Sequence, residues 1–159
     1  MKINNKILKK ISSWFGLKLI EKNYVKNNRL LLVVSAALIK DEKVLFQQRP
    51  ADKSMPFLWE LPGGKIKANE SPEIALCREL YEELDVRIDK LLPLTFISHS
   101  YPSFHLLMPV YICRKWEGSI KSKENQKIQF FKKEELGNIN MLEADKLLIK
   151  PLKKVLARS

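Results

Sequence analysis

The chain has 159 residues, of which 45% are hydrophobic, and a formal net charge of +11. This length suits one domain with a buried core, and the sequence has no apolar run of the roughly 18 residues needed to span a bilayer. The two cysteines, Cys77 and Cys113, have no metal-like spacing and stand in apolar surroundings, which excludes a disulfide scaffold and predicts reduced core residues in a cytoplasmic protein.

The first 29 residues differ in character from the rest and are expected to form a basic amphipathic extension. They contain eight basic residues and one acidic residue, a net charge of +7. Their apolar residues recur at helical spacing and are Ile3, Ile7, Leu8, Ile11, Trp14 and Phe15. The favoured interpretation is a helix docked on the domain. A start that does not pack, and contact with an anionic membrane or with nucleic acid, are the less favoured alternatives.

Apolar stretches after residue 29 predict a sheet. Strands are expected at 30–39, 44–48, 91–100, 104–114 and 128–131, and a C-terminal helix at 142–157. The first two strands flank a polar turn, so they are expected to pair as a hairpin. Pro109 has no N–H to donate and predicts an edge strand or a bulge. Strands and helices in this order indicate an α/β sandwich.

A helix at 72–84 has the clearest boundaries in the sequence. Ser71 suits the N-cap, Pro72 suits the first helical position, and Glu73 favours the positive end of the helix dipole. The sequence therefore predicts where this helix begins from local signals alone.

The same helix gathers acidic side chains on one face of an otherwise basic chain. Glu79, Glu82 and Glu83 stand at i, i+3 and i+4, which places them side by side. From residue 60 to residue 85 the chain has seven acidic and three basic residues, a net charge of −4. Because like charges repel, a hard divalent cation is expected among these carboxylates. An ordinary Glu-rich surface helix is the alternative for this face alone.

The spacing around this helix resembles the Nudix box. Gly64, five residues, Glu70, seven residues and then the run from Arg78 to Val86 follow the pattern G-x5-E-x7-R-E-U-x-E-E-x-G-U. Asp85 replaces the last glycine of the box. It is expected to end the helix in a left-handed conformation, where Asp is among the less costly replacements for Gly. We therefore expect weaker capping and retained chemistry.

Three flanking stretches, at 44–52, 59–66 and 115–118, resemble the MutT branch of the Nudix hydrolases, which removes oxidised nucleotides such as 8-oxo-dGTP. The resemblance implies a Nudix domain at 30–159, folded as an α/β/α sandwich with a mixed β-sheet. It also implies an enzyme that uses Mg²⁺, with Mn²⁺ as the other candidate. The expected reaction converts a nucleoside triphosphate to a monophosphate and pyrophosphate, which would cleanse the nucleotide pool and prevent replication errors. No obligatory protein partner is implied.

The resemblance further assigns roles to single residues. The expected metal ligands are Gly63, through its carbonyl, and Glu79, Glu82, Glu83 and Glu124. Glu82 and Glu83 are the main ligands of this set, whereas Glu79 is either a further ligand or the general base. Glu124 stands among lysines, where a solvated surface residue is the alternative. Oxygen ligands of this kind suit Mg²⁺.

Substrate contacts are expected from three positions. Arg49 suits a phosphate because its guanidinium can bond two oxygens at once, and a surface salt bridge is the alternative. The backbone of Gly64 can approach the ligand closely. Asp145 would read a base edge through its carboxyl group or, equally, cap the last helix. Arg78 is expected to orient a carboxylate of the box.

Rival functions stay open at this point. Within the same chemistry, the substrate could instead be an RNA 5′ end, a dinucleoside polyphosphate or CTP, and the basic N-terminus supports RNA. A nucleotide-binding domain without catalysis is a rival from another class. The intact Glu70, Glu79, Glu82 and Glu83 argue against it.

Overall fold

The computed structural model describes residues 29–157. The predicted basic extension lies outside these residues, except for Arg29. Among the described residues, no helix is long and apolar enough to cross a membrane.

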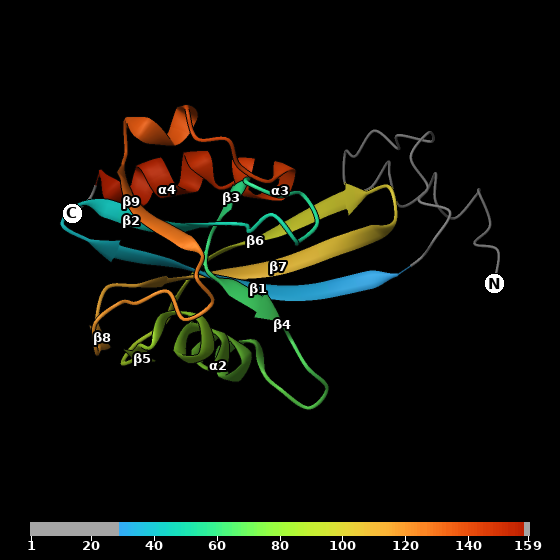
Figure 1. Cartoon of the computed structure of the whole chain (residues 1–159), viewed down its shortest axis with the longest axis horizontal. Coiled ribbons are helices and arrows are strands. Elements are labelled where there is room, and N and C mark those ends of the chain that lie inside the picture. The colour runs from blue at the N-terminus through green and yellow to red at the C-terminus, as the bar shows by residue number, and fades with distance from the viewer. Residues whose placement is uncertain (1–28, 158–159) are drawn as a thin grey trace, which may run out of the picture.

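A seven-stranded mixed sheet forms the centre of the protein (Figure 1). Its strands are β1 (Leu30–Lys40), β2 (Lys43–Gln48), β3 (Trp59–Glu60), β4 (Gly63–Lys65), β6 (Leu92–Tyr101), β7 (Phe104–Cys113) and β9 (Lys127–Lys132). The order is β3-β2-β1-β7-β6, with β4 also paired to β1 and β9 to β2. Only β1 and β7 run parallel; the other pairs are antiparallel. The predicted hairpin of β1 and β2 is confirmed by the pairing of Ile39 with Val44.

Helices lie on both faces of the sheet, as Figure 1 shows. One face carries α2 (Pro72–Leu84), and the other carries α3 (Glu143–Lys146) and α4 (Ile149–Leu156). A short 3₁₀ helix, η1, spans Glu135–Gly137, and the small strands β5 (Arg87–Ile88) and β8 (Trp116–Glu117) form a separate pair. Each face has its own buried apolar cluster. The predicted α/β/α sandwich with a mixed sheet is therefore confirmed.

The boundaries of α2 agree with the sequence signals. The Ser71 side chain accepts a hydrogen bond from the backbone N–H of Ile74, as an N-cap does. Leu76, Leu80 and Leu84 are buried and hold the helix on the sheet. Asp85 ends the helix with φ 59°, in the predicted left-handed conformation, and its N–H donates to the carbonyl of Tyr81. Because these leucines pack on the sheet, they fix the direction in which the acidic face of the helix, with Glu79, Glu82 and Glu83, points.

The predicted single C-terminal helix is wrong, because the structure has two helices there. α3 ends at Lys146 and α4 begins at Ile149. Between them, Leu147 and Leu148 donate to carbonyls only three residues back. Pro151 explains the break, since proline is accepted in the first turn of a helix but not in its interior.

Two further expectations need correction. Pro109 lies in β7, an inner strand, so the edge position is wrong. The β1–β7 pairing skips this position, in keeping with the missing N–H donor, and the bulge lies in β6 between Pro93 and Thr95. Cys77 is exposed rather than in the core, because it lies beside the buried leucine stripe of α2, whereas Cys113 is buried as expected.

Replacing Asp85 with glycine is expected to stabilise the protein by about 0.5–1 kcal/mol, because glycine adopts a positive φ without steric cost. The half-exposed ion pair of Asp85 with Lys123, at 3.6 Å, would offset little of this gain. Urea unfolding measures the change as a higher midpoint at constant slope. Asp89→Gly, on the same connection, is the control and should bring no gain. A lower midpoint for Asp85→Gly would contradict this account of the helix end.

Candidate active site

Two adjacent glycines bring the backbone of β4 against β1 and α2. Gly63 has φ 145°, and a Cβ there would lie 2.1 Å from the carbonyl oxygen of Val34. A Cβ on Gly64 would lie 2.3 Å from the carboxyl carbon of Glu79. A larger residue is therefore excluded at Gly63 by backbone atoms, whereas one at Gly64 would displace the carboxylate of Glu79, which lies directly beside the glycine backbone.

Arg78 organises most of the acidic cluster. Its guanidinium donates to Glu70 at 2.6 and 2.9 Å, to Glu79 at 2.7 Å and to Glu82 at 3.1 Å. It also donates to the carbonyl of Lys65 at 3.2 Å. The two bonds from Arg78 to Glu70, together with the bond from the N–H of Lys67, lower the pKa of Glu70 to about 2. Arg78 therefore contacts a carboxylate of the box, as predicted, and in addition ties α2 to the preceding loop.

Glu83 lies apart from this network and faces inward. It accepts hydrogen bonds from the side-chain amide of Gln47 at 3.0 Å and from the N–H of Gly63 at 3.4 Å. Burial raises the pKa of Glu83 to about 7, and the negative charges of Glu79 and Glu124 add to this. A cation near Glu83 would therefore be stabilised by several carboxylates.

The loop that carries Glu124 is fixed to the end of α2. The N–H groups of Lys121 and Lys123 donate to the carbonyls of Leu84 and Glu83, at 3.0 and 2.9 Å. These bonds satisfy carbonyls that the helix end leaves free. Glu124 itself is exposed and accepts a hydrogen bond from Gln126 at 3.3 Å. Anchoring of this loop brings the charge of Glu124 close enough to raise the pKa of Glu83.

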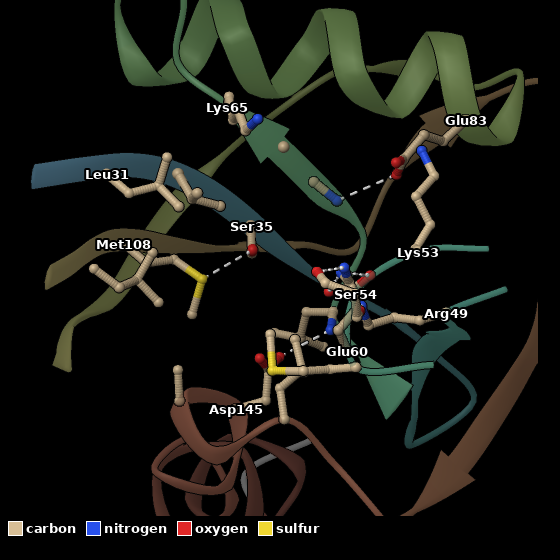
Figure 2. Close-up of a pocket in the computed structure, with 18 of the residues that line it drawn as sticks. Leu31, Ser35, Arg49, Lys53, Ser54, Glu60, Lys65, Glu83, Met108 and Asp145 are labelled. Carbon is tan, nitrogen blue, oxygen red and sulfur yellow. Dashed lines mark hydrogen bonds and ion pairs between the residues drawn. The ribbon is translucent and has the colours of Figure 1, made fainter. Parts of the chain in front are cut away.

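A cavity of about 480 Å³ connects these groups with an apolar region. Figure 2 shows Leu31 and Met108 on one side of it, and Glu83 and Lys53 on the other. The lining also includes the apolar residues Val33, Phe104 and Leu106 and the charged residues Arg49, Glu60, Lys65 and Glu124. One concave site therefore combines charged groups with an apolar surface.

Arg49 lines the cavity but is already engaged. It makes two bonds to the carboxylate of Glu60, at 3.0 and 2.8 Å, and two to Ser54, at 2.7 Å to the carbonyl and 3.1 Å to the hydroxyl. Burial raises the pKa of Glu60, and the charge of Arg49 opposes that rise. The predicted alternative of a salt bridge is therefore present, although Arg49 is mostly buried rather than on the surface.

The loop held by Arg49 has an unusual backbone. Met55 and Phe57 have φ values of 53° and 63°, which is uncommon for large residues. Met55 lines the cavity, as does Lys53. The contacts of Arg49 with Ser54 thus fix a strained loop with two of its side chains at the site.

Asp145 lines the cavity, near Glu60 in Figure 2, and is only 4% exposed. Its carboxylate accepts a hydrogen bond from the N–H of Leu61 at 3.0 Å, across 84 residues of sequence. Burial raises the pKa of Asp145 to about 7. It caps neither α3 nor α4, whose N-cap residues are Leu142 and Leu148, so the predicted alternative of a helix cap is wrong.

Sequence patterns missed several residues of the site. Gln47 sits on a buried strand and bonds Glu83, and Lys53 and Lys65 supply positive charge at the cavity. A buried glutamine in an apolar strand was the only available signal. The lysines are not distinguishable in sequence from the many others in this basic chain.

The donor chemistry of the site suits a hard divalent ion, although the ligands are not gathered. Among residues 29–157, no three His, Cys, Asp or Glu side chains are grouped to hold a metal. Glu79 and Glu82 are paired with Arg78, whereas Glu83 is bonded only by weaker neutral donors. The buried side-chain oxygens of Gln47 and Gln126 have no partner. Oxygen donors in this arrangement fit a cation among Glu83, Glu124 and the glycine turn.

Comparison with known proteins places this fold and site in a family. The model of the NUDIX domain family matches residues 34–151, and the chain belongs to that family as a Nudix hydrolase. Members of this family generally need a divalent metal ion. The observed helix, glycine turn and glutamates are thus those of an enzyme that hydrolyses nucleotide substrates.

Three of the similar proteins show how far the resemblance extends along the chain. An 8-oxo-dGTP diphosphatase of Proteus vulgaris is 34% identical over 95 residues, which is 58% of this chain and 85% of the relative. A CTP pyrophosphohydrolase of Escherichia coli is 45% identical over 58 residues, 36% of this chain and 43% of the relative. The solution structure of the E. coli ORF135 protein superimposes with a TM-score of 0.72 at 26% identity, covering 82% of this chain and 94% of the other.

Replacing Asp145 with asparagine is expected to stabilise the metal-free protein increasingly as the pH rises. The pKa of Asp145 is higher in the folded state than its ordinary value of 3.8, so folding favours the protonated carboxyl. Its contribution to stability is fully present below about pH 4 and is lost as the pH rises through about 7. The stability of Asp145→Asn relative to the wild type should therefore increase between these pH values.

Urea midpoints measured from pH 4 to 8 test this expectation. Glu143→Gln, an exposed neighbour on the same short helix, is the control. A difference between wild type and Asp145→Asn that does not change with pH would contradict the burial of a titrating carboxyl.

Proposed function

We propose that this protein is a metal-dependent pyrophosphohydrolase that cleaves a nucleoside triphosphate to a monophosphate and pyrophosphate, with 8-oxo-dGTP as the favoured substrate. The relatives named 8-oxo-dGTP diphosphatase support this choice, since one is matched over 85% of its own length. Such an enzyme would cleanse the nucleotide pool and act in the cytoplasm.

One observation carries the proposal. The same cavity is lined by carboxylates, lysines and apolar side chains, and its buried acid, Asp145, lies across it from Glu83 (Figure 2). A nucleotide has matching parts, because its phosphates are charged and its base is flat and largely apolar. Glu83 and Asp145 would therefore address opposite ends of one substrate.

The proposed catalytic roles fall on the carboxylates bonded to Arg78 and on Glu83 and Glu124, which Arg78 does not bond. A divalent ion, Mg²⁺ by preference and Mn²⁺ as the other candidate, would neutralise phosphate charge in this site. Glu82, Glu83, Glu124 and the carbonyl of Gly63 would hold it, with Glu79 as a further ligand or the general base. As the general base, Glu79 would accept a proton from the water that attacks phosphorus. The bond between the attacked phosphorus and the oxygen that bridges the α and β phosphates would then break, which would release the monophosphate and pyrophosphate.

Substrate positioning would come from other residues. The backbone of Gly64 lies beside Glu79, where the phosphates would pass. Arg49 has most of its donors engaged by Glu60 and Ser54, so its proposed phosphate contact would use what remains. Asp145 would bond a base edge with the carboxyl oxygen that Leu61 does not occupy.

CTP is the second candidate substrate. The stretch shared with a CTP pyrophosphohydrolase is 45% identical, although it spans only 43% of that enzyme. A carboxyl group such as that of Asp145 can accept from the amino group of a cytosine when ionised, or donate when protonated. The preferred base therefore depends on how Asp145 is used.

Glu83→Gln is expected to lose metal-dependent turnover by about 100-fold or more, because the amide removes the charge that would bind the ion. Pyrophosphate release from 8-oxo-dGTP, dGTP, CTP, a dinucleoside polyphosphate and triphosphorylated RNA would be measured as kcat/KM. Glu73→Gln is the matched control, since Glu73 lies on the same helix but bonds Tyr111 away from the cavity.

The results of this experiment test the metal assignment and the substrate preference separately. Full activity of Glu83→Gln in a folded protein would overturn the metal assignment. If CTP or RNA leads the panel while Glu83→Gln is inactive, the chemistry stands and the preference for 8-oxo-dGTP is wrong.

Lys53→Ala is expected to raise KM about 10-fold with a smaller change in kcat, because a free cation at the cavity would bind phosphates in the ground state. Lys53→Arg should restore most of the affinity. Lys67→Ala, an exposed lysine of the loop before α2, is the control. An unchanged KM in Lys53→Ala would exclude this contact with substrate.

A further inference from the structure

The sheet face that carries α2 is only partly covered by it. The helix packs over one half of this face, where the buried cluster includes Val34, Leu38, Tyr111 and Cys113. Figure 1 shows that the end of the sheet where β1 begins extends beyond α2. We call that uncovered half the open sheet face. Its residues are Leu30, Leu32, Phe96, Ser98, Ser100, His105, Leu107 and Pro109.

Strand register shows that these residues share one face. Leu30 pairs with His105 and Leu32 with Leu107 across the parallel strands β1 and β7. On the other side, Phe96 pairs with Pro109, Ser98 with Leu107 and Ser100 with His105 across β6 and β7. Paired residues project to the same side of a sheet, and alternate residues along a strand do so too. The open sheet face is thus continuous with the half that α2 covers.

This face is apolar and exposed. Leu30, Leu32 and Phe96 are 55%, 41% and 66% exposed, and each is a large hydrophobic residue. Sheets made only of parallel strands are almost always covered on both faces, whereas this mixed sheet has one parallel pair. Here the pair β1–β7 is covered by α2 over only part of its length. The described residues therefore leave exposed a group of large apolar side chains of the kind that marks an interaction site.

The polar members of the face do not oppose burial. His105 is bonded through both ring nitrogens, to the hydroxyl of Ser98 at 2.9 Å and to that of Ser100 at 2.8 Å. Because these three groups satisfy one another, covering them would remove few hydrogen bonds to water. The face also has no acidic member. Its occupant should therefore be apolar where it makes contact.

We propose that the N-terminal segment, through its apolar residues between positions 3 and 15, docks on the open sheet face of its own chain. Those residues recur at helical spacing and would lie on one side of a helix. The lysines of the segment would point to solvent. The chain enters β1 at Leu30, which is itself part of the face, so the segment is joined to the surface that it would cover.

The length of the segment allows this contact. Thirteen residues in a helix span about 20 Å, and the 14 residues from there to residue 29 reach up to about 45 Å when extended. Tethering gives the segment a high effective concentration at the face, on the order of millimolar for a short linker. An occupant in the same chain is therefore favoured over a second copy at ordinary protein concentrations.

Engineered cysteines test the contact in the full chain. Ile7, Ile11 and Trp14 would each be changed to Cys together with Phe96→Cys, in a Cys77→Ser background that removes the exposed native thiol. At low micromolar concentration, at least one pair is expected to form an intrachain disulfide under mild oxidation. The same segment positions paired with Lys150→Cys, on α4 at the opposite face of the sheet, are the control and should react at least about 10-fold more slowly.

The outcomes decide between occupants. Concentration-dependent dimers linked through Phe96→Cys would overturn the proposal in favour of a second copy of the chain. Equal rates for the Phe96→Cys and Lys150→Cys partners, or no intrachain bond with any pair, would show that the segment does not rest there.

A thermal coupling measurement gives an independent check. Ile11→Ser and Phe96→Ser should each lower Tm by roughly 2–5 °C, and the double variant should lose little more than the larger single effect. Additive losses would overturn the proposal. So would an Ile11→Ser variant with unchanged Tm that loses binding to phosphatidylglycerol vesicles, since the segment would then serve a membrane.

Discussion

The ion-pair network of Arg78 is the interaction on which the site depends. One guanidinium binds Glu70 of the loop, Glu79 and Glu82 of α2, and the carbonyl of Lys65 at the end of β4. Removing it would leave three carboxylates to repel one another and would free the loop from the helix. The network thus stabilises the fold locally and fixes the direction of two proposed catalytic side chains.

The carboxylates that Arg78 does not reach are held differently. Glu83 is partly buried and Asp145 is buried, each accepts hydrogen bonds from neutral donors, and desolvation raises the pKa of both. Burial without a cation is costly for a charged group. Glu83 and Asp145 therefore both gain from a bound partner. A metal ion beside Glu83 would stabilise its negative charge, whereas a substrate beside Asp145 would form a hydrogen bond with its carboxyl group. The site thus contains two kinds of acid: those paired with the charge of Arg78, and those bonded only by neutral donors.

Elements that neighbouring residues determine could be predicted from the sequence, whereas contacts between residues far apart along the chain could not. Helix 72–84 was predicted to the residue because Ser71 and Asp85 act on their immediate neighbours. The break near Pro151 was also encoded locally, but the apolar periodicity of the C-terminal stretch outweighed it. Contacts such as Gln47 with Glu83 join residues 36 positions apart on different elements. Pairings of that kind follow from topology, which a single sequence does not state.

The parallel pairing of β1 with β7 has a consequence for how the protein folds. Leu30 lies opposite His105, so the central ladder closes a loop that contains most of the sheet and all of α2. Closing so long a loop costs entropy before any contact compensates, which slows folding. Since Gly63 packs on β1 and the apolar side of the cavity is built from β1 and β7, the site takes shape only when this slow step is complete. Enzymatic activity would therefore report that β1 and β7 have paired.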